Sequence, residues 1–325
     1  MLNKITTPSG PAVLRAAGPE RAERTAPRAI SRRRRAFLDS TGQVAFVAPA
    51  FIMVTLFVLI PIGIAFYLSL TNWNGFSPNP GFVGTANYER ILEDDAALRA
   101  GTFTAILAIC GTLGCNVAGL GFALLLTRST RFNSFMRALL FYPYVIGALM
   151  IGFIWSAILG ANGVINSALE SAGLDKIPFL SDPTLSALSV IAVTIWAAFG
   201  VNLVLYLAGL QTIDESMLEA AKIDGASTSQ IFWQVKLPLL APVVTVNIVL
   251  SAVALLKTYD LVLSLTSGGP AGRTETVAYQ ILAVSFSNGS LGYGAAQSVV
   301  LMVVVVAVTV AITSFRNRAE RNVAA

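Results

Sequence analysis

The sequence predicts an all-α integral membrane protein with six transmembrane helices. Its composition is 55% hydrophobic and only 12% charged, with a mean hydropathy of +0.71, whereas soluble globular chains carry about 25% charged residues. The charges are clustered, and they leave apolar runs long enough to cross about 30 Å of hydrocarbon. Because lipid offers no partner for backbone N–H and C=O groups, such runs fold as helices.

The expected spans follow the uncharged runs in chain order. Pro49 and Pro61 in the first span are compatible with a helix, because neighbouring helices can satisfy the freed backbone groups. Between the first two spans, 87–92 is expected to form a short helix on the membrane surface. All spans belong to one transmembrane domain, expected over 41–320. The six spans lie at roughly 44–70, 102–126, 138–159, 185–209, 239–260 and 296–315.

The distribution of Lys and Arg predicts the orientation of these spans. With a cytoplasmic N-terminus, 17 of the 22 Lys and Arg residues lie on the inner side and four on the outer side, with Lys257 at the edge of the fifth span. The Asp and Glu residues divide evenly apart from Asp260, so the bias belongs to the cations. We therefore expect a multi-pass protein of a bacterial-type cytoplasmic membrane, with both termini cytoplasmic. The net charge of +5 reflects this topology, and no nucleic-acid partner is expected.

Residues 1–40 are expected to form a disordered, basic cytoplasmic tail. They are rich in Arg, Ala, Pro and Ser and contain four consecutive arginines, Arg32 to Arg35. The tail serves as a positive-inside anchor, and an alternative role is binding of anionic lipid headgroups. A cleaved signal peptide is not expected, because the apolar run that starts near Val44 is too long for the hydrophobic core of such a peptide.

The sequence lacks the residue most often used in acid–base catalysis and metal binding, and it lacks the motifs that carry such chemistry. It contains no His, which removes the commonest acid–base group and metal ligand. The two cysteines, Cys110 and Cys115, are five residues apart within one expected helix, so they face different directions and should not pair. No phosphate-binding loop or nucleophile elbow is present. The chain is therefore expected to be no enzyme and to hold no cofactor or metal.

A polar segment at 211–238 interrupts the apolar pattern. Asp214 is expected to cap a helix that starts at Glu215, and Gly225 to end it with a left-handed turn. Ser227 is expected to cap a second short helix, Thr228–Val235. In the first helix Leu218 and Ala221 form an apolar stripe, with Met217 as a further candidate, and small alanines permit close approach, which suits docking into a groove of a partner. The alternative is an ordinary loop helix that lies on the membrane.

The spacing within this segment resembles the cytoplasmic loop of ABC importer permeases. Glu219–Ala220–Ala221 is followed by three residues, Gly225, nine further residues, and then Val235, Lys236, Leu237 and Pro238. In that family this loop is the coupling helix, which sits in a groove of an ATPase subunit. Asp214 departs from the family, which often has Pro there, but both residues suit a helix start.

Four further blocks resemble carbohydrate-uptake type 1 permeases, the kind found in maltose and glycerol phosphate transporters, and specifically their first permease partner. The blocks occur in the family's order and cover about 45–315. They are Pro61 to Asn74, Phe82–Val83–Gly84 with Asn87–Tyr88, Gly163 to Asn166, and Leu265 to Pro270 with Gly292 to Ala296.

The resemblance implies the fold of a type I ABC importer permease with specific partners. These are a second homologous permease that completes a heterodimer, ATPase subunits that hold ATP and Mg²⁺, and an extracytoplasmic solute-binding protein. It implies import of a sugar or oligosaccharide, with a polyol or glycerol phosphate as the alternative. No Arg lies within any expected span, which favours a neutral sugar. The implied ATPase-coupling residues are Glu219, Ala220, Ala221, Asp224, Gly225, Leu237 and Pro238.

Polar and aromatic residues within the spans are candidates for the solute path. The resemblance places Trp196 and Ser251 where relatives of the maltose type contact sugar, and Ala198, Leu255 and Thr258 at the other such positions. The alternative is that these side chains pack against neighbouring helices. The candidates are Trp196, Asn202, Asn247, Ser251 and Thr258.

A charged pair suggests a further role at the outer mouth, and two other protein classes are alternatives to an importer permease. Lys257 and Asp260 are expected to share a helix face near the outer interface, where Lys257 extends to water or the pair gates the outer mouth. A secondary transporter would need intramembrane carboxylates, which the spans almost lack, and a second repeat. A membrane enzyme would need catalytic side chains near an interface.

Overall fold

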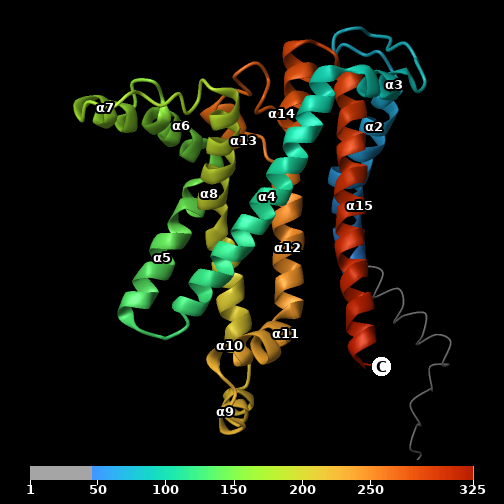
Figure 1. Cartoon of the computed structure of the whole chain (residues 1–325). Helices are drawn as coiled ribbons and strands as arrows, with labels where there is room; N and C mark the ends of the chain where they lie inside the picture. Colours follow the sequence, from blue (N-terminus) through green and yellow to red (C-terminus); the bar gives the residue numbers. More distant parts are fainter. Residues whose placement is uncertain (1–45, 325) are drawn as a thin grey trace, which may run out of the picture. The chain divides into compact units, whose positions relative to one another are not determined.

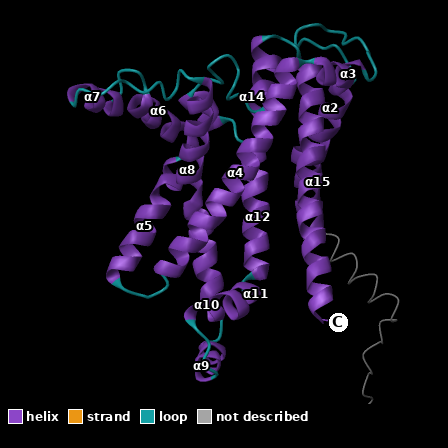
Figure 2. Ribbon diagram, in the orientation of Figure 1, coloured by secondary structure: helices purple, strands orange, loops and turns teal. Residues whose placement is uncertain are grey.

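The computed structural model describes residues 46–324, with side chains described as far as Arg316. The predicted basic tail, 1–40, lies outside the described residues. The chain divides into a unit of residues 1–58 and a unit of residues 59–325, and the second contains almost every element discussed below (Figure 1). In the described part all regular structure is helical (Figure 2), and the one β contact is an isolated bridge between Thr71 and Phe82. The prediction of an all-α fold is confirmed.

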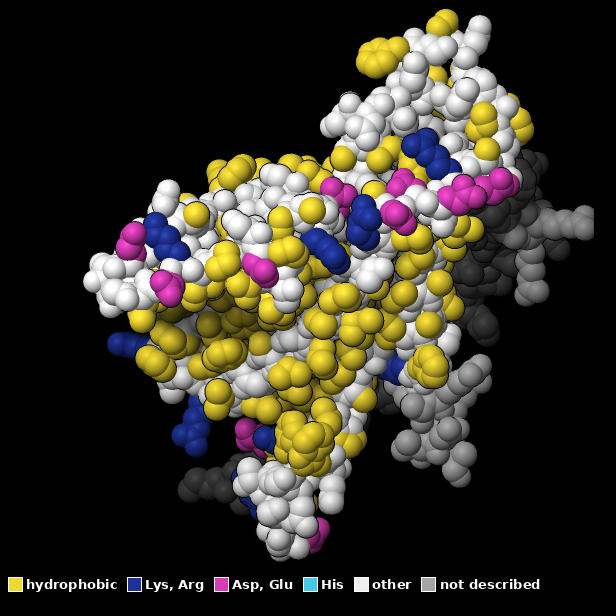
Figure 3. All heavy atoms as spheres, turned by 45° about the horizontal axis from the view of Figure 1, so that its top comes forward, with side chains coloured by type: hydrophobic (Ala, Val, Ile, Leu, Met, Phe, Trp, Pro, Cys, Tyr) yellow, Lys and Arg dark blue, Asp and Glu magenta, His cyan; other side chains and the backbone are white. Residues whose placement is uncertain are grey.

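The long apolar helices match most of the predicted spans. Within the described residues, five helices are long and apolar enough to cross a membrane, or six if one bent pair counts as a single span. Apolar side chains cover the middle of the face shown in Figure 3, and charged side chains gather toward its two ends. Four of these five match predicted spans, namely Phe46–Ser69, whose last part is α2 (Ile60–Ser69), α4 (Asp95–Leu125), α8 (Pro183–Gln211) and Leu291–Arg316 in α15 (Leu291–Ala324). The fifth is Ala148–Ser171, and α12 (Ala241–Leu256), the second half of the bent pair, matches the predicted fifth span.

Helix α4 begins seven residues before the predicted start at 102, and its first residues show why. The Asp94 side chain caps the helix by accepting the backbone N–H groups of Ala96 and Ala97, at 2.9 and 3.4 Å. Its second oxygen accepts the hydroxyl of Tyr293 at 2.8 Å. The predicted start was placed after Arg99, the last charged residue before the apolar run. The Asp94 cap instead lets the helix begin at Asp95, so that it includes charged residues.

The predicted third span, 138–159, is not one helix, and its predicted bounds are wrong, because the candidate span there is Ala148–Ser171. The segment divides into α5 (Arg131–Ile146) and α6 (Ala148–Leu159), with Gly147 between them at φ 91° and ψ 145°. Glycine adopts this backbone conformation at little cost, whereas an L side chain there is strained. Figure 1 shows α5 running beside α8, while α6 and then α7 (Val164–Ser171) turn across the end of the bundle.

The predicted fifth span, 239–260, ends too late. Helix α12 stops at Leu256, and the next helix, α13 (Asp260–Leu265), starts after a short break. Lys257 and Asp260 therefore do not share a helix face, and the prediction that they do is wrong. Both side chains are exposed, and no ion pair joins them in the described structure.

Glycines allow the central helices to approach closely. A Cβ on Gly119 of α4 would lie 2.6 Å from Asn202 Cβ and 3.0 Å from the Leu203 nitrogen of α8. A Cβ on Gly200 of α8 would lie 2.6 Å from the Leu140 carbonyl oxygen of α5. The α4–α8 and α5–α8 contacts therefore bring backbone against backbone, which holds these three helices together around the site described below.

The end of the bundle opposite α9 (Glu215–Ile223) carries short helices and loops. The predicted short helix at 87–92 is confirmed as α3 (Ala86–Glu93). Its buried Asn87 donates to the carbonyls of Ser69 and Thr71, each at 2.8 Å, and so ties α3 to the end of α2. Next to α13 lie α14 (Val277–Leu282) and a π-helical turn at Ala283–Ser287.

Candidate functional site

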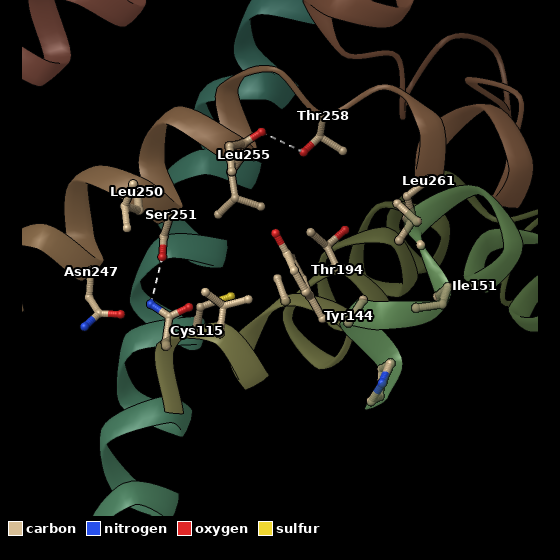
Figure 4. A pocket seen from close by; sticks show the side chains of 18 of the residues that line it. Cys115, Tyr144, Ile151, Thr194, Asn247, Leu250, Ser251, Leu255, Thr258 and Leu261 are labelled. Carbon is tan, nitrogen blue, oxygen red and sulfur yellow. Dashed lines mark hydrogen bonds between the residues drawn. The ribbon is translucent and has the colours of Figure 1, made fainter. Parts of the chain in front are cut away.

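A cavity of about 600 Å³ opens between α5, α8 and α12. Figure 4 shows Ser251, Tyr144 and Thr194 around its centre, with Leu255 and Leu261 in the wall. Most of the lining is apolar, and no charged residue takes part in it. Four predicted path residues line it, namely Asn202, Asn247, Ser251 and Thr258.

One hydrogen bond crosses the cavity wall from α8 to α12. The Asn202 amide donates to the Ser251 hydroxyl at 2.8 Å, and both residues are buried (Figure 4). The close approach of Gly119 fixes the backbone of Asn202, so the position of the amide follows from α4–α8 packing. This buried amide–hydroxyl pair therefore joins α8 to α12 within the cavity wall.

Asn247 stands one helical turn before Ser251 on α12. Its amide nitrogen donates to the Val243 carbonyl at 3.1 Å, while its side-chain oxygen accepts no hydrogen bond from the described residues. The residue is fully buried, and an unpaired buried carbonyl is unfavourable by about 1–3 kcal/mol. Its unpaired oxygen makes Asn247 a candidate hydrogen-bond acceptor in the cavity wall.

Thr258 lies just after α12, not within a span as predicted. Its hydroxyl donates to the Ala254 carbonyl at 3.3 Å, and its own carbonyl accepts the Thr276 hydroxyl at 2.6 Å. The side chain still reaches the cavity because α12 ends beside it. The cavity also includes Ala198 and Leu255, which stand where the resemblance places solute contacts.

Trp196 does not join the other four candidates. It lines a separate groove of about 390 Å³, where its ring meets Trp155 of α6 edge to face at a centroid distance of 5.5 Å. Six residues are about one and two-thirds turns of helix, so Trp196 and Asn202 face different sides of α8. The side chain remains 42% exposed in this groove.

Two polar cavity residues were missed by reasoning from the sequence. The Tyr144 hydroxyl of α5 points toward the middle of the cavity, and Thr194 of α8 lies close by (Figure 4). Tyr144 comes directly after Pro143 and shortly before the break at Gly147. A proline followed four residues later by a glycine was the sequence signal for a break in the helix. The prediction of a continuous helix over 138–159 ignored this signal, and so it did not place Tyr144 in a cavity.

The polar segment folds largely as predicted. Asp214 accepts the Ser216 backbone N–H at 2.9 Å, and hydrogen bonds from that N–H and the Ser216 side chain hold the pKa of Asp214 below its usual value. Gly225 has φ +79°, the predicted left-handed turn. The Ser227 hydroxyl caps the next helix by accepting the Gln230 backbone N–H at 3.3 Å, and the Gln230 side chain accepts the Ser227 backbone N–H in return at 2.8 Å.

The second helix of this segment continues past the predicted end at Val235. It comprises α10 (Thr228–Gln230), a π-helical stretch at Ile231–Lys236 and α11 (Leu237–Leu239), and then bends by 67° into α12. The π-helical turn precedes Pro238, which has no backbone N–H to donate, and the wider turn accommodates the missing bond. The segment therefore enters α12 as one bent helix pair.

Burial separates two sides of α9. Leu218 and Ala221 are half-buried, as the predicted apolar stripe requires, but Met217 is exposed and does not belong to it. In Figure 1, α9 projects beyond the ends of α8 and α11. Of the implied coupling residues, Ala221 and Leu237 are half-buried, and Glu219, Ala220, Asp224, Gly225 and Pro238 are exposed.

A helical membrane bundle with an uncharged polar cavity and a projecting helical segment has the architecture of a membrane transport subunit. The chain belongs to the family described as binding-protein-dependent transport system inner membrane component, which matches residues 115–322. Our prediction of an ABC importer permease is thereby confirmed. The matched range includes the cavity and the whole polar segment.

Three relatives show how closely related proteins are described. An sn-glycerol-3-phosphate transport system permease protein of Agrobacterium fabrum is 36% identical, over 81% of this chain and 90% of the relative. A probable starch degradation products transport system permease protein of Thermoanaerobacterium thermosulfurigenes is 33% identical, over 82% and 90%. A diacetylchitobiose uptake system permease protein of Streptomyces coelicolor is 32% identical, over 84% and 81%.

Solved structures support the fold independently. The chain superposes on a bacterial ABC transporter involved in import of the acidic polysaccharide alginate with a TM-score of 0.75 and 20% identity. The match covers 87% of this chain and 98% of that one. At this identity the likeness establishes the importer permease fold and nothing about the solute.

Proposed function

We propose that this permease carries a neutral sugar or oligosaccharide through the cavity between α5, α8 and α12. The observation that carries the proposal is the cavity lining, where amide and hydroxyl groups stand among apolar side chains without any charged group. A sugar presents hydroxyls at its rim and C–H groups on its faces, and this mixed lining complements both. The solutes in the relatives' descriptions, starch degradation products and diacetylchitobiose, are of this class.

Glycerol phosphate is the second candidate, because one relative is described by that solute. A phosphate ester is usually held by Arg or Lys, and neither lines the cavity. A polyol fits the lining as a sugar does. The charge of the preferred solute therefore separates these candidates.

Import is proposed to draw on three partners. An ATPase subunit would receive α9 in a groove and would hold ATP and Mg²⁺, so this chain itself needs no cofactor. A second homologous permease would close the path, and an extracytoplasmic binding protein would deliver the solute. The related alginate transporter has been solved with a periplasmic protein bound to alginate pentasaccharide. Both termini are proposed to be cytoplasmic, on the same side as α9.

An affinity purification from native membranes tests the partners. The tagged chain in mild detergent should retain a second permease and an ATPase, and Glu219→Lys should lose the ATPase while keeping the permease. Glu93→Lys on α3 is the matched control, because it makes the same charge change at an exposed site on the opposite end. A chain that purifies alone would contradict the importer assembly.

An uptake assay on the purified assembly in proteoliposomes tests the solute. Wild type should import a malto-oligosaccharide, and Ser251→Val should reduce uptake about tenfold, because it removes the partner of Asn202 and narrows the cavity. Ser298→Val, a serine in α15 that bonds only its own helix, should have little effect. Uptake of glycerol phosphate in preference to the sugar would reject the neutral-sugar proposal.

A further inference from the structure

A second polar cavity lies under α9, away from the solute path. Its volume is about 550 Å³, and its charged lining consists of Lys222 at the end of α9 and Lys236 at the end of the π-helical stretch. The hydroxyl-bearing residues Thr228 and Ser229 line it as well. No carboxylate takes part in the lining, so the cavity offers two positive charges and hydroxyl groups to a ligand.

These polar groups are not used by the fold. Among the described residues the one ion pair joins Lys176 to Glu170, so neither cavity lysine is paired with a carboxylate. The hydroxyls of Thr228 and Ser229 make no hydrogen bond to another described residue. By contrast, Arg137 is occupied, because its guanidinium donates to the carbonyls of Leu126, Thr127 and Arg128, just after the end of α4.

The remaining wall of the cavity is apolar. Leu124 of α4, Leu218 of α9, and Ile231 and Phe232 of the π-helical stretch complete it. Next to this wall Trp233 is 63% exposed and meets the Phe232 ring at a centroid distance of 5.0 Å. Tryptophan is enriched where membrane helices meet lipid headgroups. The cavity therefore joins a cationic part to an apolar part beside the end of α4, a helix long and apolar enough to cross a membrane.

We propose that this cavity binds the headgroup phosphate of an anionic phospholipid from the bilayer. The phosphate would lie between the ammonium groups of Lys222 and Lys236, and the glycerol and upper acyl chain would contact Leu124, Leu218 and Phe232. Basic pockets at the ends of membrane helices bind anionic headgroups in this way. A bound lipid would link α9 to α4 and to the start of the bent helix pair.

The position of the cavity favours a lipid over a protein side chain. Leu218 and Lys222, one turn apart, line the cavity; Leu218 is half-buried, whereas Lys222, Glu219 and Ala220 are exposed. A partner that contacts Glu219 and Ala220 would leave the apolar wall at Leu218 open to lipid. The proposal does not rest on the identity of the transported solute or of the ATPase.

Native mass spectrometry of the full chain, titrated with phosphatidylglycerol in detergent, tests the proposal. Each lysine near an anionic surface strengthens binding about fivefold, so Lys222→Gln or Lys236→Gln should weaken retention of phosphatidylglycerol about fivefold. The double variant should weaken it about 25-fold by the same reasoning. Lys222→Arg with Lys236→Arg should restore it. Lys176→Gln with Lys257→Gln is the control, because it removes two exposed cations elsewhere.

The possible results separate lipid from other ligands. Equal binding of phosphatidylglycerol and phosphatidylcholine by wild type would overturn the proposal, even if the glutamine variants failed to fold. Equal loss in the control pair would show a general charge effect and would also overturn it. If wild type bound inorganic phosphate but retained no phosphatidylglycerol, the cavity would be a site for soluble phosphate and the lipid assignment would be wrong.

Discussion

The backbone conformation of Gly225 gives the sharpest prediction for a single residue. Gly225 has φ +79°, and no atom lies within 4 Å of a Cβ built on it. A side chain there would therefore strain the backbone by about 1–2 kcal/mol without clashing. We expect Gly225→Val to reduce ATP-driven uptake about tenfold in proteoliposomes while the amount of inserted protein stays unchanged.

Gly173 provides the matched control for this variant. It has φ +76°, also with nothing within 4 Å of a built Cβ, and it lies just past α7, at the opposite end from α9. Gly173→Val should carry the same strain and leave uptake nearly unchanged. Equal losses in both variants would show that backbone strain in general, and not the turn after α9, limits transport.

The cap of α4 gives a pH-dependent prediction at Asp94. Burial raises the pKa of this carboxyl. Hydrogen bonds from Tyr293, Ala96 and Ala97 and the charge of Arg90 lower the pKa by more than burial raises it, so the net pKa lies below the ordinary value of 3.8. A carboxyl whose pKa is lowered by folding stabilises the folded state at pH values above its pKa in the unfolded chain. This stabilisation is lost as pH falls through the lowered pKa of the folded state.

Substituting Asp94 should therefore have an effect that depends on pH. Asp94→Ala is expected to destabilise the protein by about 1 kcal/mol at neutral pH, because the N-cap is lost. The difference from wild type should shrink at pH values below the lowered pKa, which thermal unfolding in detergent from neutral to acidic pH would measure. Asp94→Asn keeps a capping oxygen and should lose less. A loss that stays constant with pH would show that the carboxylate charge contributes nothing.

At the scale of elements, the break between α5 and α6 depends on Gly147. With φ 91° and ψ 145° and no atom within 4 Å of a built Cβ, its role is conformational. We expect Gly147→Ala to destabilise the protein by about 1–3 kcal/mol. Gly101→Ala, inside α4 and equally free of contacts, should instead stabilise it by about 0.5–1 kcal/mol.

Melting temperatures in detergent would measure both glycine variants. A stable Gly147→Ala protein would mean that α5 and α6 can form the single helix originally predicted over 138–159. Tyr144 would then be expected to leave the cavity, because it depends on the turn at Gly147 for its place.

Elements that depend on neighbouring residues could be predicted from the sequence, and elements that depend on contacts between distant residues could not. The caps at Asp214 and Ser227 involve neighbours within three residues, so local chemistry was sufficient. Helix α12 ends at Leu256, and the next helix, α13, packs against α6 and α8, which are distant contacts that an apolar run does not reveal. Hydropathy indicates how long an apolar segment is, but it does not detect a turn inside such a segment, as at Gly147.

At the scale of the whole molecule, labelling can test the proposed orientation. Along the 59–325 unit, α4, α8 and α15 run in one direction and α5 and α12 in the other (Figure 1). In a background without Cys110 and Cys115, we expect Glu219→Cys to react with an impermeant thiol reagent only in inverted vesicles. Asn288→Cys, at the other end, should react only in intact cells. The reverse pattern would place both termini outside.

The sequence by itself determined the class of this protein. Long uncharged runs require helices because lipid cannot bond the backbone, and the spacing from Glu219 to Pro238 was sufficient to indicate an importer permease. Both features are local in the chain, so no knowledge of packing was needed.

Only the tertiary structure decided which residues form each site. Asn202 and Ser251 are 49 residues apart, and their hydrogen bond exists because glycines let α4, α8 and α5 approach. Trp196, on the same helix as Asn202, was excluded from the cavity because it faces another side. Lys222 and Lys236 line one cavity only because the chain reverses at Gly225. Packing between segments that are distant in the sequence decides which helix faces meet. A local pattern of residues does not reveal these contacts.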